Sequence, residues 1–381
     1  MFNAENKSSG YWPSPDQQNL LEACLLEADA AREAWEKWKH ADIDNLDQGS
    51  FRLLPLLSKK LNELQIDDPC LAKLKGVHRH FWVRNQVLFH HMTRLLQIFA
   101  ADGIRTLVLK GAPLSLLYYG DLGLRPMSDF DILISPGDRD KALRLLRENR
   151  WQPIYFPSFD DLSDSYLSFA TSHGFRDSDQ REIDVHWHLF PTCASQHCDQ
   201  GLWDRAEPFT YNNLRTLTLS PADHLLHICG HGAAWNEIPP IRWVADAVTI
   251  IRATGERLDW DLLVRESQSR ALGLALRDAL TYLHESFAIS VPADCLQKLR
   301  SLPHDNIEKF MLRAQNAPLS KRGLGMEFRL LYQTYRHWIS RENVPGGFAT
   351  FLKVMQHTAK KTSLYEMYGY AIRQGFKRFS N

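Results

Sequence analysis

Apolar residues in the first hundred positions recur at helical spacing. Behind Ser14-Pro15, a pair that favours helix initiation, they repeat every three or four residues: Leu21, Cys24, Leu25, Ala28, Ala31, Trp35 and Trp38. Further helices are predicted from Leu56 to Leu64 and from Pro69 to Gly103. Residues 1–103 are therefore expected to form an N-terminal helical region, and nothing in them suggests chemistry.

The apolar period changes at Ile104. The run TLVL predicts a short strand, and APLSLLYY, after Lys110-Gly111, predicts two helical turns. FDILI predicts a second strand, Asp138 is placed to cap a following helix, and HGFRDSDQREIDVHWHLF predicts a hairpin that turns near Asp179-Gln180. We expect residues 104–219 to form a mixed sheet flanked by helices, which is the core of an α+β fold.

Helical patterning returns at Ser220-Pro221, where Asp223 is placed to complete the N-terminal hydrogen bonding. From there the chain is predicted to be helical almost to its end. Breaks are expected at the prolines Pro239-Pro240, Pro292, Pro303, Pro318 and Pro345-Gly346-Gly347. Residues 220–381 are thus expected to be a C-terminal helical domain that ends in a basic, aromatic tail.

The charge balance locates that tail. Over 381 residues, 45 Lys and Arg match 45 Asp and Glu, so no overall field draws the protein to an anionic partner. From Leu319 to Asn381, however, eleven basic residues face three acidic ones. Basic residues interleaved with aromatics can bind RNA or a membrane surface, and they also occur in amphipathic bundles with an aromatic core and solvated charges. The sequence leaves both readings open.

Targeting signals and cysteine usage indicate the compartment. The start, MFNAENKSSGYW, has no basic and apolar leader, and no window approaches about 18 uninterrupted apolar residues, so we expect neither export nor a transmembrane segment. The cysteines are scattered and form no CxxC pair: Cys24, Cys70, Cys193, Cys198, Cys229 and Cys295. This usage is typical of a reducing cytoplasm.

Candidate chemistry begins in SDFDILI. The strand period of two places Asp129 and Asp131 on one face, and Phe130, Ile132 and Ile134 on the other. An isolated DxD triplet is commonly a solvated turn. The apolar strand context favours a metal site here, because a half-buried carboxylate pair is costly without a cation.

A third carboxylate lies in EIDVHWHLF, where Asp184, His186 and His188 alternate with apolar residues. If this strand lies beside the DxD strand, Asp184 completes a cluster of three carboxylates. Such a cluster suits two Mg²⁺ ions about 3.5 to 4 Å apart, one activating a hydroxyl and one neutralising a triphosphate. The alternative is a surface hairpin with incidental polar residues.

Lys110-Gly111 stands where a strand is expected to pass into a helix. A glycine there lets backbone N–H groups approach phosphate, and the helix N-terminus favours negative charge. Arg125 can neutralise phosphate oxygens. Equally, the glycine can serve only the backbone conformation, and Arg125 can be a surface residue of a loop.

Together these motifs resemble the nucleotidyltransferase superfamily of the DNA polymerase beta type, and most closely an uncharacterised bacterial nucleotidyltransferase family within it. The resemblance covers roughly residues 85–190, with LKG, R-x3-D-x-D-I-L-I and I-D-V-H-W in the family's order. It implies that Asp129 and Asp131 bind the metals and that Asp184 helps to activate the acceptor. It also implies a nucleotide-phosphate loop that comprises Lys110, Gly111, Ala112, Ser115 and Arg125.

The loop departs from the superfamily at Ala112, where a serine usually follows the glycine. The hydroxyl contact to phosphate is therefore absent, which puts activity in question. Ser115, one helical turn later, is the candidate replacement.

The helical part contains His224, His227 and His231 at i, i+3 and i+7, on one helical face. The resembling family tends to show a similar order of His, His, Arg-Trp and Asp. We therefore expect His227 and His231 to line the acceptor cleft with His186, Arg242 and Asp246. The alternatives are histidines packed in a bundle and, as a different class, a hydrolase with a metal on the histidine face, although the familiar zinc spacing is missing.

The leading interpretation is a Mg²⁺-dependent nucleotidyltransferase. It would move a nucleoside monophosphate from an NTP, such as ATP, to a hydroxyl-bearing acceptor and release pyrophosphate. The acceptor is open among a small molecule, a sugar, an RNA and a protein side chain. The competing interpretation is a non-catalytic module that keeps the fold and binds a nucleotide or a partner protein.

Overall fold

The computed structural model describes residues 12–162, 164–190, 197–232, 240–304 and scattered positions between 306 and 352. Its described strands form one sheet in the order β3-β4-β5-β2-β1-β7-β6. Their bounds are β1 (Leu107–Leu109), β2 (Asp129–Leu133), β3 (Gln152–Pro153), β4 (Ser172–Arg176), β5 (Glu182–His186), β6 (Glu207–Tyr211) and β7 (Leu214–Thr218). The pairs β2/β5 and β1/β7 are parallel and the other neighbours are antiparallel, so the predicted α+β fold with a mixed sheet is confirmed.

The described chain before the sheet is helical, as predicted. Its helices are α1 (Pro15–Leu25), α2 (Ala28–Trp38), α3 (Gln48–Phe51), α4 (Leu54–Glu63) and α5 (Leu71–Ala101). Ser14 caps α1 in a reciprocal exchange of hydrogen bonds with Gln17. The apolar repeat from Leu21 to Trp38 spans two helices, because Ala28 has a φ of +29° that a continuous α-helix cannot accommodate.

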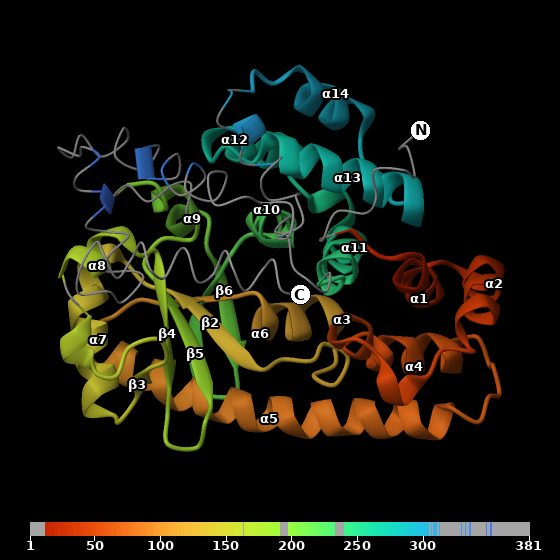
Figure 1. Ribbon diagram of the computed structural model, residues 1–381, viewed down its shortest axis with the longest axis horizontal. Helices are drawn as coiled ribbons and strands as arrows, with labels where there is room; N and C mark the ends of the chain where they lie inside the picture. Colours follow the sequence, from red (N-terminus) through yellow and green to blue (C-terminus); the bar gives the residue numbers. More distant parts are fainter. Residues whose placement is uncertain are drawn as a thin grey trace, which may run out of the picture.

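Helix α5 packs across one face of the sheet, below it in Figure 1. Six of its apolar side chains join a core with sheet residues: Leu88, Phe89, Met92, Leu95, Leu96 and Phe99. Phe130 and Ile132 of β2 point into this core. Because successive strand residues face opposite sides, the same packing directs Asp129 and Asp131 to the other face.

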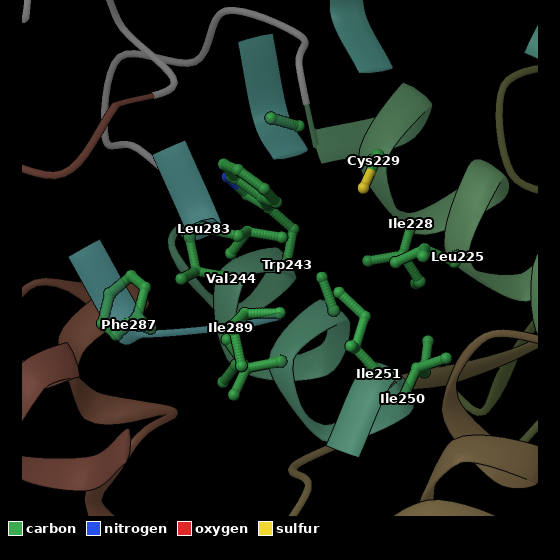
Figure 2. Close-up of a cluster of buried hydrophobic side chains, with 14 of the residues drawn as sticks. Leu225, Ile228, Cys229, Trp243, Val244, Ile250, Ile251, Leu283, Phe287 and Ile289 are labelled. Atoms are coloured by element: carbon green, nitrogen blue, oxygen red, sulfur yellow. The ribbon is translucent and has the colours of Figure 1, made fainter. Parts of the chain in front are cut away.

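C-terminal helices lie over that other face, above the sheet in Figure 1. They are α10 (Pro221–Gly232), α11 (Arg242–Thr254), α12 (Trp260–Ser269), α13 (Gly273–Phe287) and α14 (Ala293–Ser301). Figure 2 shows part of their core, in which Leu225 and Ile228 of α10 lie near Val244 and Ile251 of α11. The same apolar cluster contains Leu109 and Leu133 from the sheet, together with residues of α1 and α4. One core therefore joins all three predicted regions, and their boundaries at residues 103 and 219 stay a prediction.

Short helices complete the region around the sheet: α6 (Gly111–Pro113), a π-helical turn (Leu114–Tyr119), α7 (Arg139–Glu148), α8 (Asp164–Phe169) and α9 (Gln200–Asp204). The helical turns predicted after Lys110-Gly111 and the helix predicted after Asp138 are both present. Asp138 stands at the N-cap of α7 but forms no side-chain capping bond, so its predicted capping role is wrong. The predicted hairpin is β4–β5, and Gln180 at its turn has a φ of +62°.

Several sequence predictions lie wholly or mostly outside the described residues. These include the basic aromatic tail and the breaks at Pro318 and Pro345-Gly346-Gly347. Within the described part of the chain, no helix combines the length and the apolar character needed to cross a bilayer. Cys24, Cys70, Cys229 and Cys295 are free, whereas Cys198 takes part in a disulfide, so the cytoplasmic location stays a prediction.

Candidate active site

The centre of the site is the parallel pair β2/β5. Its register places Asp131 beside Asp184, Leu133 beside His186 and Asp129 beside Glu182. The prediction that the Asp184 strand lies next to the DxD strand is therefore confirmed. Since residues in register share a face of the sheet, both aspartates of this pair project toward the C-terminal helices.

Three side chains lie close enough to share one metal ion. One ligand atom from each of Asp131, Asp184 and His186 lies within 4.8 Å of the other two. Asp129 is outside this group, and its carboxylate accepts a hydrogen bond from the Ser128 hydroxyl at 3.1 Å. His186, predicted on the acceptor side, instead lies with the carboxylates, and its Nε2 is 3.4 Å from Asp131 Oδ1. Carboxylate oxygens and imidazole nitrogens are both ligands of divalent cations.

Burial makes the negative charge of this cluster costly. The pKa values of Asp129 and Asp184 are raised, first because burial disfavours the ionised form and second because Asp131 adds like charge. Burial acts in the same direction on Asp131, but Lys110 and His186 outweigh it and hold its pKa well below the usual range. Asp131 is therefore compensated, whereas at Asp129 and Asp184 the effect of burial outweighs that of the nearby cations.

Lys110 provides that compensation from the end of β1. The Nζ of Lys110 donates to Asp131 Oδ1 at 2.8 Å, across the antiparallel pair in which Leu109 lies opposite Asp131. The backbone of Lys110 has φ +46° and ψ −110°, a region that side chains other than hydrogen rarely adopt. Strain of this kind costs of order 1–3 kcal/mol and concentrates at functional sites.

Gly111 is required by the close approach of the chain before β2. A Cβ at this position would lie 2.5 Å from Met127 Sδ and 3.0 Å from Arg125 Nη1. Ala112 is buried, and the hydroxyl of Ser115, fully buried, donates to the Gly111 carbonyl at 2.9 Å. The prediction that Ser115 supplies the missing phosphate hydroxyl is not supported, because a hydrogen bond inside the helix already engages that hydroxyl.

Arg125 and Asp246, predicted on the phosphate and acceptor sides, bind each other. Arg125 Nε and Nη2 donate to the two Asp246 oxygens at 2.9 and 2.8 Å, and the Tyr119 hydroxyl donates to Asp246 Oδ1 at 2.9 Å. Both charged groups are at most 4% exposed. This buried pair ties α11 to the loop before β2. Both Asp246 oxygens therefore accept hydrogen bonds from within the protein, and Arg125 Nη1 lies near Gly111.

Two further arginines, Arg52 and Arg242, interact electrostatically with Asp129. Burial lowers the pKa of both guanidinium groups, to about 10 for Arg242. The nearby Arg125 cation lowers both pKa values further, and the Asp129 carboxylate raises them. Arg242 donates to the Pro126 carbonyl, which places it at the approach to β2 rather than in a separate acceptor cleft. Arg52 lies at the end of α3, in a region whose sequence suggested no chemistry. Only the fold brings these guanidinium groups together beside a carboxylate.

Gly174 of β4 makes room for Asp184. The two residues are opposite each other in the β4/β5 ladder, and a Cβ at Gly174 would lie 2.9 Å from Asp184 Oδ1. Atoms in ordinary contact stay about 3.5 Å apart or more. Sequence reasoning missed this glycine, although an isolated glycine inside a predicted strand is the signal of such a close approach.

Of the three α10 histidines, His224 belongs to the core, whereas His227 and His231 interact electrostatically with Lys110 of the site. His224 is buried, contacts the Thr218 hydroxyl at 3.0 Å, and has its pKa lowered to about 3 by burial. His227 is buried, and burial and the Lys110 cation hold its pKa far below the usual value. Lys110 also lowers the pKa of His231, an exposed residue, to about 3. Among the described residues, the three histidines form no metal-ligand group, so the hydrolase alternative gains no support.

A model of the family described as "Uncharacterised nucleotidyltransferase" matches residues 50–288, which is more than half of the chain. The chain belongs to this family. The match extends well beyond the resemblance at residues 85–190: it begins just before Arg52 and includes α10 and α11.

Other comparisons are weaker. A solved structure of an antigenic nucleotidyltransferase-like protein from Paracoccidioides brasiliensis is 15% identical. The similarity covers 58% of this chain and 94% of that chain, with a TM-score of 0.34. None of the curated proteins matches. The family's bacterial origin and its wider superfamily stay predictions.

Proposed function

We propose that this chain is a Mg²⁺-dependent nucleotidyltransferase that moves a nucleoside monophosphate from an NTP to a hydroxyl-bearing acceptor. The acceptor oxygen would bond to the α-phosphorus, the bond from that phosphorus to the bridging oxygen would break, and pyrophosphate would leave. The observation that carries the proposal is the register of β2 and β5. It joins Asp131 and Asp184 on one face, next to the turn at Lys110 and Gly111.

The residues of the cluster fit a divalent cation. Two carboxylates and an imidazole converge within 4.8 Å, and the raised pKa of Asp184 reflects negative charge that a cation would balance. Asp131 and Asp184 would hold the ion, with His186 beside them and Asp129 on the side of the arginines. Bound there, Mg²⁺ would supply charge neutralisation to the triphosphate and acidify the attacking hydroxyl.

The phosphate side would be formed by Gly111, Arg52 and Arg242. Guanidinium groups recognise phosphate oxygens through paired, charge-assisted hydrogen bonds. Lys110, bonded to Asp131, would turn toward phosphate when a cation takes over that carboxylate. Replacing Arg52 by Gln is therefore expected to weaken NTP binding roughly tenfold, in line with the loss of one charge-assisted bond.

The acceptor side would lie toward α10. Asp184, a carboxylate of the cluster on this side, would take the hydroxyl proton. His227 and His231 interact electrostatically with Lys110 and His186, which supports a role for them on the acceptor side. Both histidines stay neutral near pH 7 and can therefore accept or donate hydrogen bonds without adding charge.

The test uses α-labelled NTPs, Mg²⁺ and cell extract as the source of acceptor. We expect a labelled product with the parent chain and none with Asp129→Ala/Asp131→Ala. Undiminished labelling with the double variant would refute the proposal. Arg215→Gln, on exposed β7 surface, is the matched control and should label normally.

A second candidate is a nucleotide-binding module without turnover. The specific observation that favours it is the Lys110 ammonium seated on Asp131, together with Ala112 in the phosphate loop. Calorimetry with NTPs separates the two functions. Binding that is equally tight with and without Mg²⁺, with no labelled product, would support the module.

A further inference from the structure

A polar cavity lies on the α5 side of the sheet, away from the carboxylates. Its volume is about 180 Å³, and three elements line it: α5, the turn after α7 and the β4–β5 turn. In Figure 1 these elements meet at the lower left, where the β4–β5 turn crosses α5. Sites for drug-sized ligands usually have about 300–1,000 Å³, so this cavity suits a small ion or group.

The lining is basic. Arg94, Arg150 and Arg181 contribute three guanidinium groups, against one carboxylate from Asp177. That carboxylate is already engaged: Oδ1 accepts from the backbone N–H groups of Asp179 and Arg181, and Oδ2 accepts from Arg181 Nε at 2.7 Å. Asp177 therefore offers little free negative charge to repel an anion.

Arg181 is held in place by its partners. Besides Asp177, it donates to Asp179 and, through Nη1, to His91 Nε2 at 2.7 Å. Because a guanidinium can only donate, His91 must accept through Nε2 and carry its proton on Nδ1. Burial and the Arg181 cation lower the pKa of His91, which keeps the ring neutral and suited to this bond.

Arg94 and Arg150 are different. In the part of the chain that the structure describes, no carboxylate lies within ion-pair distance of either guanidinium. Both side chains are exposed at the rim of the cavity. Two like charges at one rim repel each other, and an anion between them would relieve that repulsion.

The backbone at Arg150 lies in the left-handed region. Arg150 has φ +62° and follows the C-cap of α7, and the next N–H, from Trp151, donates to the Leu146 carbonyl at 3.0 Å. This is the left-handed helix ending in which glycine is strongly preferred. An arginine there accepts backbone strain that a glycine would avoid, as Gln65, Ala271 and Ala288 do at the ends of other helices.

We propose that this cavity binds a phosphate group, held by Arg94 and Arg150 with the Arg181 guanidinium behind them. The ligand is a free phosphate anion or the phosphate of a small ester. The site is separated from Asp131 and Asp184 by the sheet, and the proposal does not depend on nucleotidyl transfer.

The experiment is calorimetric titration of the full chain, in EDTA, with inorganic phosphate and separately with glycerol phosphate. EDTA removes metal-dependent phosphate binding at the carboxylates. The parent should bind one equivalent, and Arg94→Gln/Arg150→Gly should bind roughly tenfold more weakly or worse. Tighter binding of the ester identifies a phosphorylated small molecule, and tighter binding of inorganic phosphate identifies the free anion.

Arg150→Gly also separates function from stability. It removes the charge and relieves the strained backbone, so its melting temperature should equal or exceed that of the parent while phosphate affinity falls. Arg215→Gln, on β7 near the opposite edge of the sheet, removes the same charge and should leave affinity unchanged. No binding of either phosphate compound by the parent, parental affinity in the double variant, or an equal loss in Arg215→Gln would overturn the proposal.

Discussion

Gly174→Ala is expected to impair metal binding while leaving the fold intact. The added Cβ would start 2.9 Å from Asp184 Oδ1 and 3.1 Å from Ile154 Cδ1. Ordinary contacts begin near 3.4 Å, so the carboxylate must retreat by about 0.5 Å, whereas metal–ligand distances tolerate about 0.2 Å. Disturbing the surroundings of a metal ligand typically costs 10–100-fold in metal affinity, and we expect a loss of that order.

Stability should change little, because the atoms that must move are the ends of two side chains rather than backbone. We expect a change of less than about 1 kcal/mol in the free energy of unfolding. Mn²⁺ titration measures the affinity, and urea denaturation measures the stability. Gly76→Ala on α5 is the matched control, since a Cβ there meets nothing within 4 Å. Parental Mn²⁺ affinity in Gly174→Ala would refute the packing of Asp184 described above.

Three other perturbations test the electrostatics of the site. Asp246→Asn leaves the buried Arg125 cation uncompensated and should cost about 3–5 kcal/mol in urea denaturation, against about 1 kcal/mol for Tyr119→Phe; equal costs would contradict the account. Lys110→Met removes the partner that lowers the pKa of Asp131, so it should destabilise the metal-free protein by roughly 3 kcal/mol at pH 7. A carboxyl group whose pKa is lowered in the folded protein stabilises the fold at pH values above its unfolded pKa of about 3.9. The difference in stability between Lys110→Met and the parent should therefore shrink as the pH falls below that value. A difference in stability that does not depend on pH would exclude this cause. The pKa of Asp184 is raised in the folded protein, and this destabilises the fold at neutral pH. Asp184→Asn should therefore stabilise the metal-free protein at pH 7. This gain in stability should disappear as the pH is lowered through the raised pKa. Thermal melts across pH measure this effect, and a gain that persists at pH 4 would count against it.

Strand patterning allowed the centre of the site to be predicted from the sequence. The alternation in SDFDILI and EIDVHWHLF fixes which residues share a face, and the order of the motifs indicated that Asp184 lies beside Asp131. The long helix α5 and the hairpin β4–β5 follow from equally local signals. These features depend on neighbours in the chain, so a single sequence contains them.

The surroundings of the site depend on contacts between distant positions. Arg125 and Asp246 are separated by 121 residues, and nothing in the sequence around either residue indicates that the two form a buried ion pair. Arg52 comes near enough to Asp129 to interact electrostatically only because the helices before α5 fold back toward the sheet. Ser115 illustrates the converse: its spacing suggested a phosphate contact, but helical geometry gives its hydroxyl a nearer acceptor in the Gly111 carbonyl.

The most direct test of the central claim compares two labels on one nucleotide. The parent chain is incubated with Mg²⁺ and cell extract, once with α-labelled NTP and once with γ-labelled NTP. Nucleotidyl transfer at Asp131 and Asp184 predicts that the α-label enters the acceptor, that the γ-label appears only in pyrophosphate, and that Asp184→Asn abolishes both. Transfer of the γ-label to the acceptor, or α-labelling that survives in Asp184→Asn, would contradict the account.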